Sequence, residues 1–258
     1  MAATAEQMTP PAARSAVVSG GTGAIGTEIC RHLARAGLRV IALGHPQDAE
    51  RLAQWQHTLQ EAGAGVSALL ADLGDADAAA AVMQQARDHL GAIDVLVNAA
   101  GITRDARFVK MSLEQWRTVM SSNLDSVFHC CKAVFGDMCA RGHGRIVNIA
   151  SVNGQRGQFG QTNYAAAKAG MHGFTMALAQ EGAKHGVTVN TVSPGYVRTP
   201  MTAAIKAEVL DGIVAQIPVG RMAEPSDIAR VVAFLCEEGA GYITGANVPV
   251  NGGLYMSA

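Results

Sequence analysis

The sequence is poor in charge, and its net charge lies close to zero. Only 16% of the 258 residues are charged, and the formal net charge is -1 at pH 7. No block of like charge occurs, so the basic surface expected of a nucleic-acid-binding protein is missing and no nucleic-acid partner is expected. Apolar residues make up 49% of the chain, which is enough for a large buried core and excludes a disordered protein.

Other absences concern membranes, export and metals. No apolar run approaches the ~18 residues that a membrane-spanning helix needs, so no membrane partner is expected. Residues 1–14 lack the features of a signal peptide and are interpreted as a flexible lead-in. The five cysteines form no C-x-x-C pair and lie in apolar stretches, which is typical of reduced, buried thiols and indicates a cytoplasmic protein. The eight histidines show no metal-ligand spacing, and no metal site is predicted.

From residue 15 onward, short apolar segments of β type alternate with longer helical segments. Strands are predicted over residues 15–19, 38–43, 66–70, 93–98, 144–150, 187–193 and 247–250. Helices are predicted over 24–36, 49–62, 75–90, 113–140, 164–185 and 225–238. Most strands are nearly continuous apolar runs, as expected where helices cover both faces of a sheet. The sequence therefore predicts one α/β domain over 15–258, of the doubly wound Rossmann type with a seven-stranded parallel sheet.

A glycine-dense segment connects the first predicted strand to the first helix. It runs Ser19-Gly20-Gly21-Thr22-Gly23-Ala24-Ile25-Gly26. Glycines let the backbone approach a phosphate closely, and the helix that follows offers free amides and the positive end of its dipole. A tight structural turn would also use glycines, but the strand before it and the helix after it favour a dinucleotide-binding loop.

The end of the second strand bears on which nicotinamide dinucleotide binds. An acid there would accept the ribose hydroxyls and repel a 2′-phosphate, but the strand runs into Gly44 without one. Arg51 lies a little further on, within reach of a phosphate, although a solvated helix face is the commoner fate of such an arginine. NADP(H) is therefore expected, with Asp48 and Glu50 as the observations against it.

Two further segments lie where the adenosine half of the cofactor would bind. Asp72, followed by Leu73, could accept a hydrogen bond from the adenine amino group or could brace the turn that follows. The segment Asn98-Ala99-Ala100-Gly101 closes the fourth strand with small residues, which permit close packing against the cofactor or against the next helix.

Three polar residues form a candidate catalytic group. Tyr164 and Lys168 stand four residues apart on a predicted helix, so phenol and ammonium lie on one face, although such a pair alone usually marks a solvated surface. Ser151 follows the fifth strand, at the carboxyl edge where open α/β sheets bind ligands. Lys168, with help from the charge of the nicotinamide ring, is expected to lower the pKa of Tyr164. Tyr164 would then donate a proton to a carbonyl oxygen, and Ser151 would donate a hydrogen bond to the same oxygen.

With these motifs in register, residues 15–254 resemble the short-chain dehydrogenase/reductase family. The Asn, Ser, Tyr and Lys tetrad of that family matches Asn123, Ser151, Tyr164 and Lys168. The resemblance implies that Lys168 also holds the nicotinamide ribose and that Asn123 anchors a water for proton relay. It further implies that the segment Pro194-Gly195-Tyr196-Val197, with Thr199, fixes the nicotinamide carboxamide.

Within the family, the segment from Ser151 to Tyr164 resembles that of members that reduce acetoacetyl-CoA, as do residues 102–105 and 172–181. This resemblance implies an acyl-CoA substrate and NADPH-dependent formation of (R)-3-hydroxybutyryl-CoA, a precursor of polyhydroxybutyrate. It also implies a homotetramer and a substrate loop around residues 195–220. The implied substrate site is lined by Asp105, Ser151, Gln158, Phe159, Gln161 and Tyr196.

Two other functions stay open. Reductases of 3-oxoacyl-[acyl-carrier-protein] share the tetrad, but the acidic carrier protein needs a basic docking surface. The near-neutral chain offers only local candidates for such a surface, namely Arg141, Arg145 and Arg156. A non-catalytic dinucleotide-binding protein is the more remote alternative, and the presence of both Tyr164 and Lys168 argues against it.

Overall fold

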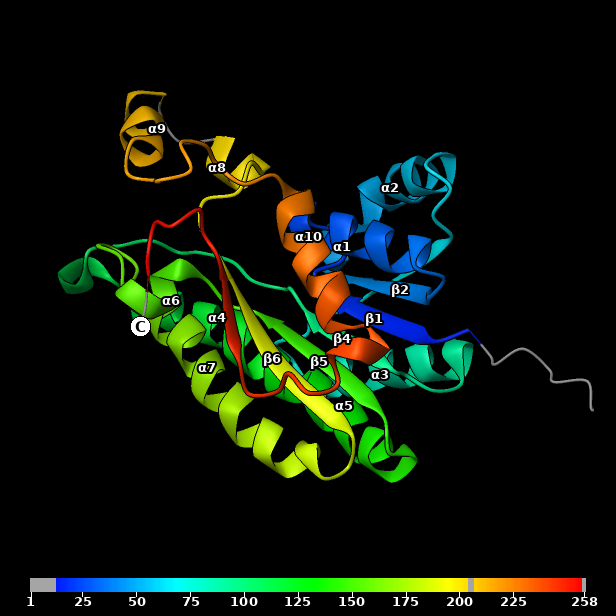
Figure 1. Ribbon diagram of the computed structural model, residues 1–258. Helices are drawn as coiled ribbons and strands as arrows, with labels where there is room; N and C mark the ends of the chain where they lie inside the picture. Colours follow the sequence, from blue (N-terminus) through cyan, green and yellow to red (C-terminus); the bar gives the residue numbers. More distant parts are fainter. Residues whose placement is uncertain (1–12, 204–206, 257–258) are drawn as a thin grey trace, which may run out of the picture.

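A seven-stranded sheet forms the centre of the protein, and all of its neighbouring strands are parallel (Figure 1). The structure is a computed structural model that describes residues 13–203 and 207–256. The strand order is β3-β2-β1-β4-β5-β6-β7. The strands are β1 (Ser15–Ser19), β2 (Arg39–Gly44), β3 (Val66–Leu70), β4 (Val95–Asn98), β5 (Gly144–Ile149), β6 (Val187–Pro194) and β7 (Asn247–Val250).

Helices cover both faces of this sheet. One apolar cluster joins the sheet to α3 (Ala76–Leu90), α5 (Ser126–Arg141) and α7 (Thr162–Ala183). A second cluster on the opposite face joins it to α1 (Ala24–Arg35), α2 (Ala49–Glu61) and α10 (Pro225–Leu235). The remaining short elements are η1 (Pro46–Asp48), η2 (Phe108–Lys110), α4 (Leu113–Met120), η3 (Ser121–Asp125), α6 (Val152–Arg156), α8 (Pro200–Ala203), α9 (Ala207–Val214) and η4 (Glu238–Ala240).

The predicted fold class is confirmed, because every residue of β1, β5 and β6 is buried between helical layers. The strand order reverses between β1 and β4, and ligands of doubly wound sheets bind at the carboxyl end of such a switch point. All seven strands lie within two residues of their predicted bounds. None of the helices in the described part of the chain combines the length and the apolarity that crossing a bilayer requires.

The single helix predicted over 113–140 is wrong. The structure has α4, then the π-helical turn η3, then α5. Asn123 in that turn is fully buried, and its side-chain amide donates to the carbonyls of Val119 at 2.8 Å and Ile102 at 2.9 Å. Because this side chain takes a backbone acceptor and the residues around it are weak helix formers, the regular ladder is interrupted here.

One further helix is shorter than predicted, and most of the predicted lead-in is not described. The helix predicted over 225–238 ends at Leu235 as α10, and η4 follows it. Of the predicted lead-in 1–14, residues 1–12 lie outside the described residues. Arg14 lies within them, and its guanidinium donates to the carbonyl of Cys236 at 2.7 Å.

Candidate active site

The glycine loop lies at the carboxyl end of β1 and packs directly against the segment after β4. Gly20 has a positive φ of 62°, and a Cβ there would lie 2.7 Å from the backbone of Ala100. The Ser19 hydroxyl accepts the backbone N–H groups of Ala99 at 3.2 Å and Ala100 at 3.3 Å. Ala99 and Ala100, which were predicted to contact the cofactor, therefore also pack against the glycine loop and hold it in place.

The amino end of α1 leaves its amides available. Gly23 is the N-cap residue and makes no side-chain capping bond, and no acid lies in the first turn. These free amides and the positive end of the helix dipole suit a pyrophosphate. The loop is close-packed, because a Cβ on Gly20, Gly21 or Gly26 would meet other atoms of the protein. A tight glycine loop beside an uncapped helix fits a dinucleotide.

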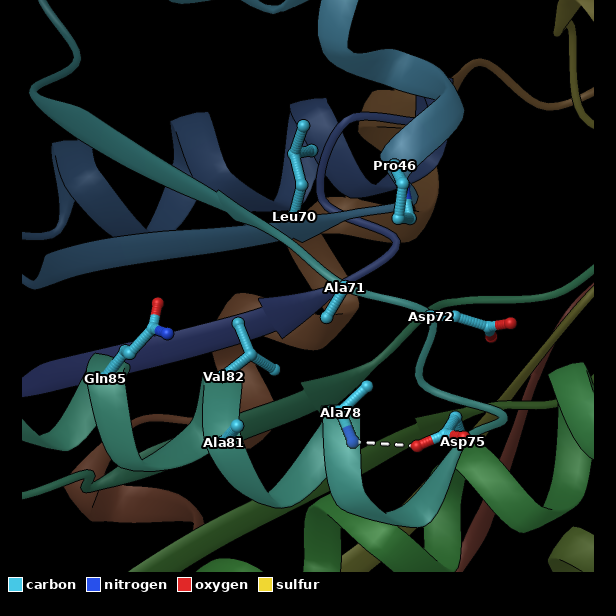
Figure 2. A pocket seen from close by; sticks show the side chains of 9 residues that line it. All are labelled: Pro46, Leu70, Ala71, Asp72, Asp75, Ala78, Ala81, Val82 and Gln85. Carbon is cyan, nitrogen blue, oxygen red and sulfur yellow. Dashed lines mark hydrogen bonds between the residues drawn. The ribbon is translucent and has the colours of Figure 1, made fainter.

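A pocket of about 510 Å³ lies beyond β3, next to the adenosine end of the predicted cofactor site (Figure 2). Pro46, Leu70 and Asp72 are among its lining residues. Asp72 accepts the backbone N–H of Gly74 at 2.9 Å, so it braces the turn, which was one of its two predicted roles. Asp72 also lines the pocket, which is compatible with its second predicted role, a contact with adenine.

Two residues that sequence reasoning missed hold this turn from the side of α4 and α5. The Ser121 hydroxyl donates to the carbonyl of Gly74 at 3.3 Å. The imidazole Nδ1 of His129 lies 2.9 Å from the carbonyl of Leu73. No local pattern in the sequence points to these contacts, because they join segments about 50 residues apart.

Ser151 follows the last residues of β5 and is the N-cap of α6, a helix that was not predicted. The side chain is 8% exposed, and its Oγ accepts the backbone N–H of Asn153 at 3.1 Å. Since this bond uses a lone pair of the oxygen, the hydroxyl proton stays free to donate to another group.

Tyr164 and Lys168 lie on one face of α7, as predicted. The Lys168 Nζ atom lies 5.6 Å from the centre of the Tyr164 ring. The ammonium group is buried and donates to the carbonyl of Ile149 at 2.8 Å. Ser151, Tyr164 and Lys168 therefore converge at the carboxyl end of β5, and the side chains face a common space rather than separate ones.

The prediction that Lys168 and the nicotinamide charge together lower the pKa of Tyr164 applies to the enzyme with its cofactor, and in the protein alone the pKa of Tyr164 lies above its usual value. Burial raises the pKa of Tyr164, a hydrogen bond with Ser151 lowers it in part, and the carboxylate of Asp105 raises it. Burial also lowers the pKa of Lys168 to about 7. Burial therefore destabilises the charged form of Lys168, which weakens the effect of that charge on the phenol beside it.

Asn123 completes the group from the π-helical turn. A Cβ on Gly101 would lie 2.5 Å from Asn123 Oδ1 and 3.3 Å from Lys168 Nζ, so both atoms converge on this glycine. Asn123 Oδ1 is buried and has no partner within the described residues. An acceptor without a partner beside a buried amine is a suitable place for a bound water, which would need such polar partners.

The residues predicted to line the substrate site divide into two kinds. The Gln161 side chain accepts from Asn153 at 2.9 Å and donates to Asp105 at 2.9 Å, so this amide already bridges two segments of the site. Gln158 and Phe159 instead face outward, and Phe159 is 82% exposed. The structure therefore brings Asp105 and Gln161 together, whereas Gln158 and Phe159 lie exposed at the edge of the predicted substrate site.

Thr202 holds the segment that follows β6. The Thr202 hydroxyl donates to the carbonyl of Val197 at 2.7 Å and accepts the N–H of Thr199 at 3.0 Å, a support that was not predicted. Tyr196 lines a second pocket of about 260 Å³ together with Ile217 and other residues. Residues 204–206 of the predicted substrate loop 195–220 lie outside the described residues.

Known proteins resemble the chain over nearly its whole length. Residues 20–255 match the family model described as enoyl-(acyl carrier protein) reductase. The chain is 53% identical to the acetoacetyl-CoA reductase of Allochromatium vinosum, over 95% of this chain and 99% of that protein. It is 51% identical to the acetoacetyl-CoA reductase of Cupriavidus necator, over 94% and 98%. The 3-oxoacyl-[acyl-carrier-protein] reductase of Pseudomonas aeruginosa is 43% identical, over 94% and 97%.

The glycine loop at the switch point and the family match define an oxidoreductase that binds a nicotinamide dinucleotide. The chain belongs to the short-chain dehydrogenase/reductase family, and the resemblance stated from the sequence is confirmed.

Proposed function

We propose that this protein reduces acetoacetyl-CoA to (R)-3-hydroxybutyryl-CoA with NADPH. The observation that carries the proposal is the convergence of Ser151, Tyr164 and Lys168 at the carboxyl end of β5. Two relatives more than 50% identical are acetoacetyl-CoA reductases, which supports this substrate.

In the proposed reaction, the reduced nicotinamide supplies a hydride to the carbonyl carbon when it is bound. Tyr164 gives its phenolic proton to the carbonyl oxygen, and the Ser151 hydroxyl, whose proton is not used in the bond with Asn153, donates a hydrogen bond to the same oxygen. Because burial raises the pKa of Tyr164, the phenol holds its proton until the oxygen gains negative charge, which suits the direction of reduction.

The lysine and the asparagine would then restore the proton. The phenolate left on Tyr164 favours the charged form of Lys168 5.6 Å away, so the ammonium is stabilised when it is needed. A water held by Asn123 Oδ1 beside Lys168 Nζ would carry the replacement proton. NADPH is favoured because β2 ends in Gly44 without an acid, and Arg51 lies beyond it.

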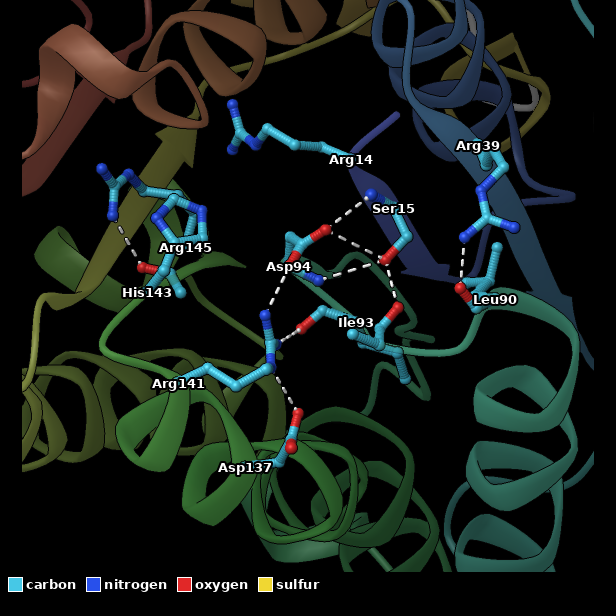
Figure 3. Close-up of polar contacts among 12 residues, drawn as sticks. Arg14, Ser15, Arg39, Leu90, Ile93, Asp94, Asp137, Arg141, His143 and Arg145 are labelled. Carbon is cyan, nitrogen blue, oxygen red and sulfur yellow. Dashed lines mark hydrogen bonds and ion pairs between the residues drawn. The ribbon is translucent and has the colours of Figure 1, made fainter. Parts of the chain in front are cut away.

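The contacts of two arginines favour CoA over a carrier protein (Figure 3). Arg141 pairs with Asp94 at 2.7 Å and Asp137 at 2.9 Å. Arg145 is 4% exposed and donates to backbone carbonyls, including that of Gly144 at 2.9 Å. Both lie at the amino end of β5, opposite the carboxyl edge that holds Ser151, so neither is free to dock an acidic carrier at the site. The third candidate, Arg156, is exposed at the end of α6, the short helix that Ser151 caps, and supplies a single positive charge there.

The proposal includes a homotetramer in the cytoplasm. Phe128 on α5 and Met176 on α7 are each 52% exposed, and Tyr242 near the carboxyl-terminal strand is fully exposed. Large apolar side chains of this kind on outward faces suit contacts between copies of the chain. Light scattering after size-exclusion chromatography tests this, and a monomer at micromolar concentration would contradict it.

The activity is tested by following NADPH oxidation with acetoacetyl-CoA and with acetoacetyl-carrier protein in parallel. The proposal expects kcat/KM at least about tenfold higher for the CoA thioester, because the two arginines above do not serve a carrier. A preference for the carrier protein by the same factor would instead establish the alternative reductase. Lack of turnover with either substrate, at normal NADPH binding, would contradict both.

A further inference from the structure

A short chain of hydrogen bonds leads from α2 into the glycine loop. The indole Nε1 of Trp55, on α2, donates to the hydroxyl oxygen of Thr27 at 2.8 Å. That hydroxyl, on α1, donates to the backbone carbonyl of Gly21 at 3.2 Å. The two helices cover the same face of the sheet (Figure 1), and Trp55 packs against the apolar cluster there. The loop is therefore bonded to α2 through a side chain of α1.

The direction of these bonds is fixed by the chemistry of the two side chains. An indole N–H only donates, so Trp55 occupies a lone pair of the Thr27 hydroxyl and leaves the hydroxyl proton for an acceptor. The backbone N–H of Thr27 donates separately to the carbonyl of Gly23 at 2.8 Å. Thr27 therefore holds the loop at two carbonyls, and Trp55 keeps the hydroxyl proton directed at Gly21.

The carbonyl side of Gly21 is the side that needs such a bond. Its N–H is already fixed, because it donates to the carbonyl of Leu43 at 3.0 Å. Its Cα is packed tightly, since a Cβ there would lie 2.6 Å from the Cβ of Ala42. A glycine has little preference of its own for the angle that sets the direction of its carbonyl. The bond from Thr27 therefore determines this direction.

The direction of this carbonyl also sets that of the next backbone donor. The peptide bond between Gly21 and Thr22 is trans, so its N–H points opposite to its carbonyl. The Thr22 N–H thus points away from α1, and it has no acceptor in the part of the chain that the structure describes. An inverted peptide would instead present a carbonyl oxygen, which repels a phosphate.

We propose that Thr27 and Trp55 are positioning residues for the dinucleotide. Thr27 holds the Gly21 carbonyl toward α1, and Trp55 fixes the direction of the Thr27 hydroxyl. The N–H of Thr22 is thereby kept as a donor to the pyrophosphate. Because the pyrophosphate is common to both nicotinamide dinucleotides, this contribution is equal for NADPH and NADH.

The test measures dissociation constants by calorimetric titration with no acyl substrate present. Thr27→Val keeps the shape of the side chain and removes the hydroxyl. The constants of NADPH and NADH should both rise about tenfold, because a hydrogen bond to a charged phosphate is lost. Thr27→Ser keeps the hydroxyl and should bind both within about twofold of the natural protein. Adenosine 2′-monophosphate, which has no pyrophosphate, should bind Thr27→Val and the natural protein equally within about twofold.

Trp55→Phe tests the second step of the chain. Phenylalanine keeps an aromatic ring in the apolar cluster and removes the N–H, so the constants of both dinucleotides should rise about threefold. Thr27→Val combined with Trp55→Phe should bind no more weakly than Thr27→Val alone, because the indole acts through the hydroxyl. Trp55→Phe also carries the test if Thr27→Val does not fold.

The matched controls are Thr58→Val and Trp116→Phe. Thr58 is an exposed residue of α2, and its hydroxyl donates to the carbonyl of Gln54 at 3.0 Å, away from the loop. Trp116 is the other of the two tryptophans and lies on α4. Both variants should leave the two constants unchanged within about twofold.

The role of Thr27 would be overturned if Thr27→Val bound both dinucleotides normally, or if Thr27→Ser bound them as weakly as Thr27→Val. Equal weakening of adenosine 2′-monophosphate would also overturn it, since the damage would then lie outside the pyrophosphate site. Strictly additive effects of the two substitutions would overturn the role of Trp55. Because no thioester is present, these results do not depend on which acyl substrate the enzyme reduces.

Discussion

Replacing Lys168 by methionine should change how the stability of the protein responds to pH. Burial lowers the pKa of Lys168 to about 7 from its ordinary 10.5. Between these two values the unfolded chain binds a proton that the folded protein does not, so the free energy of unfolding rises with pH in this window. One such group contributes about 1.4 kcal/mol per pH unit. Methionine fills a similar volume and has no proton to lose.

The assay is urea denaturation of both proteins without cofactor at pH 7.5 and 9.5, at equal protein concentration because assembly adds to stability. The unfolding free energy of the natural protein minus that of Lys168→Met should rise by roughly 2 to 3 kcal/mol over this interval. Burial raises the pKa of the Cys30 and Cys236 thiols as well, but these groups are present in both proteins and cancel in the difference.

Lys184→Met is the control, since Lys184 is exposed at the end of the same helix. Its difference from the natural protein should not depend on pH in this window. The reasoning would be refuted if the Lys168→Met difference stayed constant within about 0.5 kcal/mol, which is the usual limit for measured additivity. The buried amine would then keep its proton in the folded state.

Three further variants test the packing around the site. Gly26→Ala places a Cβ against a loop carbonyl, and calorimetric titration should show both dinucleotides binding at least about tenfold more weakly. Asn123→Ala removes the acceptor beside Lys168, and steady-state kinetics should show kcat lower by about tenfold or more. His129→Ala removes the donor to the Leu73 carbonyl and should raise KM for the dinucleotide severalfold at nearly unchanged kcat. His129→Asn keeps a donor and should return KM to its natural value. An unchanged KM would leave His129 without a positioning role.

The sheet could be predicted because its signal is local and repeated. Continuous apolar runs such as Val95-Leu96-Val97 need burial on both faces, and a parallel sheet between helical layers provides it. The positions of Ser151, Tyr164 and Lys168 followed from the same logic, since helix spacing and strand ends fix where such residues lie.

The features that the sequence did not predict depend on contacts between distant segments, which no local sequence pattern indicates. The turn at Asn123 results from a side-chain amide that bonds a carbonyl 21 residues away. In the protein alone the pKa of Tyr164 depends on burial as well as on neighbouring charges, and spacing in the sequence indicates only the charges.

The central claim is that the Tyr164 phenol supplies the proton of the new alcohol. Tyr164→Phe removes only that hydroxyl, so NADPH-dependent reduction of acetoacetyl-CoA should fall by ~10²- to 10⁴-fold, with the dissociation constant of NADPH changed by less than about twofold. A phenylalanine variant that keeps more than about a tenth of the natural turnover would contradict the claim.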